Sequence, residues 1–204
     1  MNRIVIFGAT GNTGLCALNT AVNKGLNVRA FVRDENKVPT NLKDKIEIVV
    51  GDVTNAEQVS NAISNRDAVV VVLGTRDDLE IVSVCLSGKF CLIFLLTTHI
   101  DNFHVLLINI LFLAAFLFYK PEAVPNIFKN VNVDHQRMFD LLKESKLKWI
   151  AILPPHFTSI SKYVVKHDES PGRTISKHDL GDFLIESLQQ PEHYQKVCGI
   201  IPRS

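Results

Sequence analysis

Short apolar runs alternate with amphipathic stretches in the first third of the chain. Four of these runs have the length and composition of buried parallel strands: 3–7, 26–32, 46–50 and 68–73. Between them, 13–24 carries apolar residues at helical spacing, and 56–63 fits a shorter helix. This alternation predicts an α/β fold, a Rossmann-like doubly wound parallel sheet, in a single domain that spans 1–204.

The same pattern resumes in the last third. An amphipathic helix is predicted over 133–145, and a strand over 149–153 that ends at two prolines. Residues 163–165 fit an edge strand. A further helix is predicted over 176–188, with Ser176 or Asp179 as its N-cap.

The stretch 74–119 departs from this alternation, and 81–113 is an atypical hydrophobic segment. Residues 81–86 have the pattern of a fifth strand, but 74–80 is too short for the crossover that two parallel strands need. The sheet is therefore expected to lack one covering helix. A helix formed by 105–119 is one candidate to cover the exposed face, and otherwise apolar surface would remain.

A membrane span over 105–119 is the main alternative for this stretch. That run is shorter than the roughly 20 residues a span requires, and His99, Asp101, Asn102 and His104 interrupt the apolar sequence before it. We therefore expect no membrane span.

Composition narrows the classes of partner. The net charge is +1, with both signs spread along the chain, which gives no reason to expect nucleic acid or an acidic membrane as partner. The four cysteines form no Cys-x-x-Cys pair, so neither a disulfide framework nor a metal site is predicted, and His167 and His193 stand in no motif. The N-terminus has no signal-peptide pattern, so we expect a cytoplasmic protein.

A glycine-rich loop follows the first predicted strand. Gly8, Gly11 and Gly14 have the spacing that allows a tight turn, close approach to a pyrophosphate, and close packing of helix on strand. The loop also contains Thr10, Asn12 and Thr13, and it opens a helix whose free amides attract phosphate. We expect a nicotinamide dinucleotide here; a glycine turn without ligand is the alternative.

The end of the second strand distinguishes NAD from NADP. Arg33 has a guanidinium suited to a 2′-phosphate, and Lys37 follows one turn later. Asp34 would favour NAD, because NAD sites usually place a carboxylate there for the ribose 2′-hydroxyl. We favour NADP(H). The alternative is that both cations are surface charges paired with Asp34 and Glu35.

The next two strand ends carry further candidates. Asp52 and Val53 follow the third strand and could bracket an adenine, and Leu73, Gly74 and Arg76 follow the fourth. Carboxyl ends of parallel strands are where open α/β sheets bind ligands.

Six motifs together give the chain a resemblance to a known family. They are Gly8-Ala-Thr-Gly-Asn-Thr-Gly14, Val32-Arg-Asp34, Val50-Gly-Asp-Val53, Leu73-Gly-Thr-Arg76, Pro154-Pro-His156 and Ile175-Ser-Lys-His-Asp-Leu-Gly181. Over about 1–80 and 114–190 the chain resembles the NADPH-dependent flavin reductase or biliverdin-IXβ reductase family, an atypical short-chain dehydrogenase group. The last two motifs are the most specific.

The resemblance implies hydride transfer from NADPH to a flavin (FMN, FAD or riboflavin) or to biliverdin-IXβ. By position it implies an NADP site made of Gly8, Thr10, Gly11, Thr13, Arg33, Lys37, Asp52, Val53, Leu73, Gly74 and Arg76. It also implies that Cys85 and Ser87 lie beside the nicotinamide, and that His135 and His156 line the cofactor and substrate pocket.

The Tyr-x-x-x-Lys pair of ordinary short-chain dehydrogenases is absent. Tyr163 and Lys166 have only two residues between them. A flavin needs no such acid, because N5 accepts the hydride. We take Ser87 and His156 as catalytic candidates, Ser87 for positioning or proton relay; a helix-capping serine and a buried hydrogen-bonded histidine are the alternatives. His178 is expected in a structural cap.

Two other interpretations remain. The chain could be a non-catalytic regulatory protein that binds NADP(H). It could also be a defective product of an altered transcript or gene model, with one helix skipped and an intervening sequence read through after Ser87. For the reductase we expect a monomer whose partner is a small-molecule flavin or tetrapyrrole.

Overall fold

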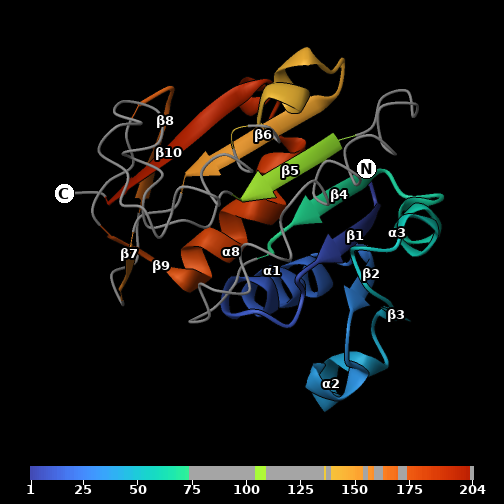
Figure 1. The fold of residues 1–204 in the computed structure, drawn as a ribbon. Coiled ribbons are helices and arrows are strands. Elements are labelled where there is room, and N and C mark those ends of the chain that lie inside the picture. The colour runs from blue at the N-terminus through green and yellow to red at the C-terminus, as the bar shows by residue number, and fades with distance from the viewer. Residues whose placement is uncertain are drawn as a thin grey trace, which may run out of the picture.

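The computed structural model describes residues 1–73, 104–108, 136, 139–153, 156–158, 163–169 and 174–202. Eight of the described strands form one sheet in the order β3-β2-β1-β4-β5-β6-β10-β8 (Figure 1). Neighbouring strands pair in parallel except β10 and β8, which are antiparallel. The order reverses between β1 and β4, as in a Rossmann sheet. The predicted α/β class is confirmed.

The helices and strands have the following bounds, which in the first third of the chain lie close to the predicted ones. The strands of the sheet are β1 (Arg3–Phe7), β2 (Asn27–Val32), β3 (Glu47–Val50), β4 (Ala68–Val71), β5 (His104–Ile108), β6 (Lys148–Leu153), β8 (Tyr163–His167) and β10 (Lys196–Pro202). A separate parallel pair is formed by β7 (His156–Thr158) and β9 (Thr174–Ser176). The α-helices are α1 (Asn12–Asn23), α2 (Thr40–Lys43), α3 (Ala56–Ile63) and α8 (Lys177–Glu186). Short 3₁₀ turns are η1 (Glu35–Lys37), η4 (Ser187–Gln189) and η5 (Pro191–His193).

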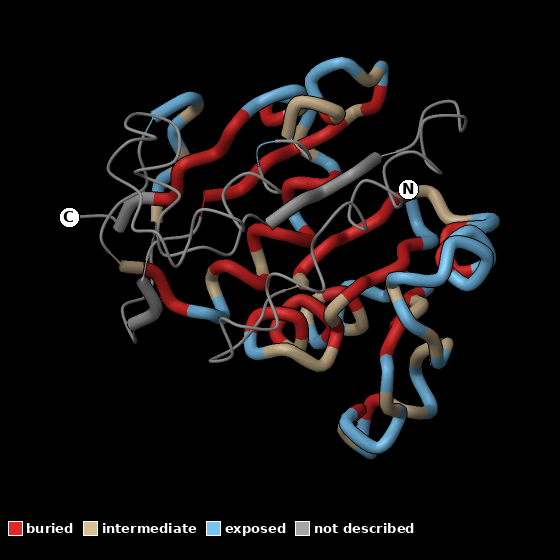
Figure 2. The backbone as a smooth tube through the Cα atoms, in the orientation of Figure 1, coloured by how far each residue is buried: buried red, intermediate tan, exposed pale blue. Residues whose placement is uncertain are grey.

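Alternate residues of the central strands face two separate cores. Ile4 and Ile6 of β1 belong to a core that also contains buried residues of α1 and α8. Val5 and Phe7, which point to the opposite face, pack in a second core with α3 and with Leu142. Strands β1, β4 and β6 are therefore buried on both faces, which explains their continuous apolar sequences. Figure 2 shows these strands buried, whereas the end of the sheet near β3 and α2 carries much exposed chain.

Helices α1 and α8 lie side by side across one face (Figure 1). A Cβ atom on Gly181 would lie 2.5 Å from the Cβ of Cys16, so the helices approach as closely as glycine permits. One turn later the Thr20 hydroxyl donates a hydrogen bond to Asp182, and after another turn Lys24 and Glu186 form an ion pair at 3.0 Å. The first helix of the glycine-loop unit is thus held by the last helix of the chain.

The N-terminal strand is fixed at its start by Asp67, which immediately precedes β4. Its carboxylate accepts hydrogen bonds from the backbone amides of Asn2 and Arg3, at 2.8 and 2.9 Å, and from the Arg3 guanidinium at 2.8 Å. Burial would raise the pKa of Asp67, but these hydrogen bonds and the charge of Arg3 outweigh burial and lower it well below its ordinary range. This contact sets the register of β1 against β4.

The strand beside β4 is β5, not the predicted strand over 81–86. Val71 of β4 lies opposite Leu107, and Ile108 lies opposite Ile152 of β6. The prediction was wrong because it took the first β-branched run after β4 as its neighbour. Residues 72–103 leave ample length for a parallel crossover, so the argument for a missing connection fails. Residues 81–86 themselves lie outside the described residues.

The proposed helix over 105–119 is wrong for the same reason, since 104–108 is a central strand. The remainder of 74–119 lies outside the described residues. No helix within the described ranges is long and apolar enough to cross a membrane.

The last third agrees with most predictions and adds three strands. Residues 136 and 139–144 are helical, within the predicted helix over 133–145. The edge strand predicted over 163–165 extends to His167, and α8 begins after Ser176, whose hydroxyl accepts a hydrogen bond from the His178 amide. Strands β7, β9 and β10 were not predicted; Gly199 and Pro202 weaken the strand signal of β10.

Candidate functional site

The carboxyl ends of four parallel strands meet at one edge of the sheet. Phe7, the last residue of β1, lies opposite both Phe31 and Val71, and Val32 lies opposite Val50. The glycine loop, the Arg33 segment, the Asp52 segment and Leu73 each follow one of these ends. They therefore share the edge at the β1–β4 switch point, where a Rossmann sheet binds its dinucleotide.

The turn after β1 requires glycine at its first position. Gly8 has φ of +84°, and a Cβ atom there would lie 2.3 Å from the carbonyl oxygen of Val72. The amide of Gly11 donates a hydrogen bond to the carbonyl oxygen of Gly8 at 3.0 Å, which closes the turn. The loop passes against the end of β4 because no side chain intervenes.

Gly14 holds α1 against this turn. A Cβ atom on Gly14 would lie 2.1 Å from the carbonyl oxygen of Gly8. The predicted packing roles of Gly8 and Gly14 are therefore seen directly in the backbone. Gly11 has a different environment, since its Cβ would come no closer than 3.3 Å to the Gly8 oxygen. The space beside Gly11 fits its predicted role, close approach of a ligand.

The first turn of α1 offers backbone amides at the same edge. Gly11 is the N-cap and supplies no side-chain cap, and the first helical hydrogen bond runs from the Leu15 amide to the Gly11 oxygen at 2.9 Å. The amides of Asn12, Thr13 and Gly14 precede that bond, at the positive end of the helix. An anion the size of a pyrophosphate group fits these donors, so the loop passes the test for a dinucleotide phosphate site.

The end of β2 presents an exposed pair of cations. Arg33 and Lys37 are both exposed, and in the described part of the chain neither forms an ion pair. The alternative in which they pair with Asp34 and Glu35 finds no support there. The Asp34 carboxylate instead accepts a hydrogen bond from the Asn36 amide at 3.0 Å and caps η1. The nearest acidic side chain is thus engaged in a turn.

The loop after β3 is ordered by its own polar groups. The Asp52 carboxylate accepts a hydrogen bond from the Thr54 amide at 2.8 Å, and the Gln58 side chain accepts one from the Asp52 amide at 2.8 Å. Val53 is half-buried against the second core. Gly51 lies over Phe31, where a Cβ would come within 2.6 Å of the ring. Val53 is therefore held at the edge near the predicted adenine position.

Sequence reasoning missed Gln58 as a positioning residue of this loop. The sequence feature that could have indicated this role is the place of Gln58 in the first turn of the helix that follows Gly51-Asp52. It also missed the contact of Gly181 with Cys16 and the hydrogen bond from Thr20 to Asp182, which hold α1 from behind.

The nicotinamide half of the predicted site lies mostly outside the described residues. These undescribed candidates are Gly74, Arg76, Cys85, Ser87 and His135. Leu73 is half-buried at the end of β4, and His156 begins β7, three residues beyond the end of β6. Leu73 thus lies at the carboxyl edge beside the glycine loop, whereas His156 follows the carboxyl end of β6, three strand positions from β1.

Two other candidates have structural roles. The Tyr163 ring packs edge-on against Phe183, with centroids 5.8 Å apart, and burial raises its pKa well above its usual range. Nδ1 of His178 lies 3.6 Å from Sγ of Cys16, between α8 and α1. Burial raises the pKa of the Cys16 thiol, although the charge of Lys177 opposes this. Neither residue offers the proton donor of an ordinary dehydrogenase.

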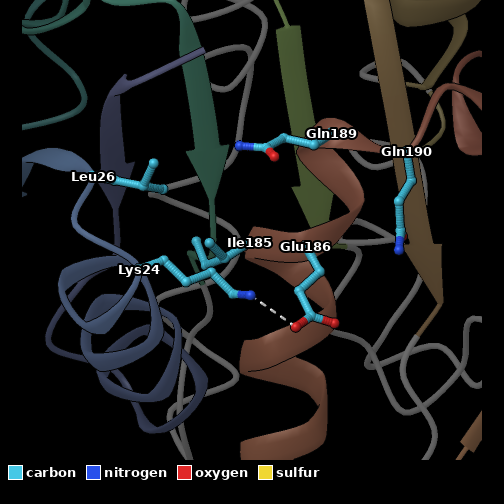
Figure 3. Close-up of a pocket in the computed structure, with 6 residues that line it drawn as sticks. All are labelled: Lys24, Leu26, Ile185, Glu186, Gln189 and Gln190. Carbon is cyan, nitrogen blue, oxygen red and sulfur yellow. Dashed lines mark ion pairs between the residues drawn. The ribbon is translucent and has the colours of Figure 1, made fainter.

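A shallow cavity of about 650 Å³ lies away from this edge. Its lining residues are Lys24, Leu26, Ile185, Glu186, Gln189 and Gln190 (Figure 3). Leu26 immediately precedes β2, so the cavity is at the amino ends of the strands, and the ion pair of Lys24 with Glu186 lies across it. Rossmann sheets bind dinucleotides at the opposite edge.

Solved structures share this fold. A Rossmann-fold NAD(P)-binding family protein from Shigella flexneri is 18% identical, with a TM-score of 0.75, over 100% of this chain and 95% of that one. A protein from Streptococcus pneumoniae named "putative NADH-flavin reductase" is 20% identical, with a TM-score of 0.77, over 100% of both chains. A short-chain dehydrogenase/reductase from Veillonella parvula, solved in complex with NADP, is 13% identical, with a TM-score of 0.76. That match covers 100% of this chain and 95% of the other chain.

One curated relative is the 3-beta-hydroxysteroid dehydrogenase of Mycolicibacterium neoaurum, 32% identical over 69 residues, which are 34% of this chain and 18% of that protein. The match therefore covers less than a fifth of that relative's length. A much longer match is to a protein family described as NAD(P)H-binding, over residues 8–191, which covers the glycine loop, all the strand-end segments and α8. By this match the chain belongs to the NAD(P)H-binding family, and it has a Rossmann fold.

Proposed function

We propose that the protein is an NADPH-dependent reductase that transfers hydride to a flavin or to biliverdin-IXβ. The observation that carries the choice of NADPH is the state of the charges after β2. Arg33 is exposed with no ion pair among the described residues, whereas the Asp34 carboxylate caps η1. A 2′-phosphate finds a guanidinium here, while Oδ1 of the neighbouring Asp34 carboxylate already accepts the Asn36 amide.

In this reductase the residues of the chain bind the dinucleotide and orient it. The amides at the start of α1 hold the pyrophosphate, Arg33 and Lys37 hold the 2′-phosphate, and Val53 packs against the adenine. Gly8 and Gly14 keep these donors in place without side chains of their own. When bound, the dinucleotide supplies a hydride, and the protein supplies a dry edge at which a second flat ring can lie against the nicotinamide.

The absence of a tyrosine–lysine acid pair supports a flavin as acceptor. Reduction of a ketone builds charge on oxygen and needs a positioned acid, whereas the flavin N5 accepts hydride and a proton can follow from solvent. Tyr163 packs against Phe183 and is not free to serve as that acid. The resemblance to flavin and biliverdin-IXβ reductases, and the name of the Streptococcus pneumoniae neighbour, point in the same direction.

Steady-state oxidation of NADPH tests the proposal. Purified protein is assayed with FMN, with riboflavin, with biliverdin-IXβ and with a 3-ketosteroid, and the rate with each is compared with the rate without acceptor. We expect turnover with a flavin or the tetrapyrrole and none with the steroid. Turnover with the steroid alone contradicts the acceptor class.

Binding without turnover separates the remaining alternatives. If NADPH raises the midpoint of thermal unfolding but no acceptor is reduced, the protein is a non-catalytic NADP(H)-binding regulator. If NADPH neither binds nor stabilises folded protein, the interpretation as a defective variant is favoured, because any ligand of the native state alone must stabilise it.

A further inference from the structure

Three side chains with metal-binding atoms meet at the sheet margin far from the glycine loop. They are His167, His193 and Cys198, and one nitrogen or sulfur atom of each lies within 4.8 Å of the others. Nε2 of His167 and Nδ1 of His193 are 2.8 Å apart, at hydrogen-bond distance. We call these three residues the His–His–Cys cluster.

The fold brings the cluster together from three elements. His167 ends β8 and lies directly opposite Cys198 in the antiparallel ladder with β10, so their side chains share a face. His193 ends η5, and its ring packs edge-on against Phe183, with centroids 5.3 Å apart. The three atoms are therefore held by the backbone ladder and by core packing.

Burial distinguishes this cluster from a chance surface group. Cys198 is fully buried and His193 is 9% exposed, while His167 is half-buried and forms the open side. Burial raises the pKa of the Cys198 thiol to about 12, and the nearby charge of Asp168 adds to this rise. Burial also lowers the pKa of His193, as does His167, while Glu192 opposes the change.

We propose that the His–His–Cys cluster binds a zinc ion. Two imidazoles and one thiolate are a donor set that Zn²⁺ prefers, and the fourth position is left to water. Ordinary Zn–N and Zn–S bond lengths in a tetrahedral site place donor atoms roughly 3.4–3.6 Å apart. The 2.8 Å between the two imidazole nitrogens and the 4.8 Å limit that contains all three atoms bracket these distances.

The protons balance in this step. The Cys198 thiol gives its proton to solvent as the sulfur–zinc bond forms. The hydrogen between the two facing ring nitrogens moves to the other nitrogen of its own ring by exchange with solvent, which frees both facing lone pairs to bind zinc. Uptake of one zinc ion therefore releases one proton.

The proposed zinc site lies away from the dinucleotide edge of the sheet. Four strand spacings separate β10 from β1, or roughly 19 Å at the usual distance between strands. A zinc ion there would join β8, an edge strand, to β10 and to the turn after α8. The dinucleotide site is not involved, so the zinc proposal and the reductase proposal can be tested independently of each other.

Calorimetric titration with Zn²⁺ and absorption spectra with Co²⁺ test the site in the full chain. We expect one ion per chain, release of about one proton when buffers of different ionisation enthalpy are compared, and a cobalt–thiolate charge-transfer band. His167→Gln should weaken zinc binding at least tenfold, and Cys198→Ser should remove the band. Cys16→Ser and His178→Gln are matched controls, because that pair has the same kinds of side chain and, within the described ranges, belongs to no group of three metal-binding residues.

Wild-type protein that binds no zinc would overturn the proposal, as would a band that persists in Cys198→Ser. If the Cys198→Ser variant does not fold, the cobalt spectrum is recorded instead on a chain in which Cys16, Cys85 and Cys91 are all replaced by serine. A band in that chain assigns the thiolate to Cys198, and its absence there contradicts the site. Unchanged zinc affinity in His167→Gln also contradicts it.

Discussion

The carbonyl oxygen of Gly8 lies where a side chain on Gly14 would have to be, 2.1 Å from the position of a Cβ atom. This contact joins the end of β1 to the first turn of α1. It fixes the direction in which the amides of that turn point. The phosphate-binding edge is therefore built from backbone, and its geometry depends on which glycine is replaced.

Replacing Gly14 by alanine should disrupt folding and binding together. Overpacking of this kind costs about 1–3 kcal/mol, and the Gly8 oxygen cannot move without shifting the turn. We expect a lower free energy of unfolding in urea and loss of NADPH binding. Gly11→Ala is the matched comparison. Within the described part of the chain its Cβ meets only the Gly8 oxygen, at 3.3 Å, so stability should change by less than about 1 kcal/mol while NADPH binding weakens. Equal stability of the two variants would contradict the packing argument.

Replacing Arg33 by glutamine should weaken NADPH binding and leave NADH binding unchanged. A lost charge-assisted hydrogen bond to phosphate corresponds to about 1.5–3 kcal/mol, or roughly 10- to 150-fold in dissociation constant. Lys45→Gln removes the same charge just before β3, at the opposite edge, and should have no effect on either dinucleotide. Isothermal titration of the three proteins measures this. An equal loss for both dinucleotides would place Arg33 outside the 2′-phosphate site.

The contact of Asp67 with the N-terminal strand predicts a pH dependence of stability. Because the pKa of Asp67 is lowered in the folded state, its contribution is complete above the unfolded value near 3.9 and disappears as the pH falls through the folded value. The unfolding free energy of the wild-type protein should therefore fall below about pH 5 more steeply than that of Asp67→Asn. At pH 7 the variant should be less stable by about 1–3 kcal/mol, as for other hydrogen bonds to charged groups. Parallel acid-titration curves for the two proteins would contradict this.

The hydrogen bond from Thr20 to Asp182 should couple α1 to α8. A double-mutant cycle with Thr20→Val and Asp182→Asn should give a coupling energy of about 1–2 kcal/mol in urea unfolding, because the pair is partly buried. The ion pair of Lys24 with Glu186 joins the same helices one turn away, but both side chains are more than 40% exposed. Its cycle should give well under 1 kcal/mol. The reverse ranking would mean that surface charge, not the buried bond, holds the helices together.

The parts of the molecule that follow from local rules were predictable. The apolar run before Gly8, the glycine spacing and the helix after it specify one βαβ unit, and the boundaries of β1 and α3 matched the prediction. Arg33 was recognised because its position is set by the length of β2. These features depend on neighbouring residues in the sequence, so the sequence alone was enough.

Features that depend on distant pairing were not predictable. The neighbour of β4 is His104–Ile108, because pairing with both β4 and β6 outweighs the stronger β-branched run at 81–86. The sequence left Asp34 as an argument for NAD beside the favoured NADP(H), and only the turn geometry shows its carboxylate on the Asn36 amide. The His–His–Cys cluster had no motif, since β8, η5 and β10 bring its members together in space.

The central claim is that a dinucleotide lies across the glycine loop with its 2′-phosphate at Arg33. Calorimetric titration of the folded wild-type protein with NADPH and, separately, with NADH tests it most directly. The account predicts one site per chain and a dissociation constant for NADPH at least tenfold lower than for NADH. Folded protein that binds neither would contradict the site, and equal affinity for both would contradict the assignment of Arg33.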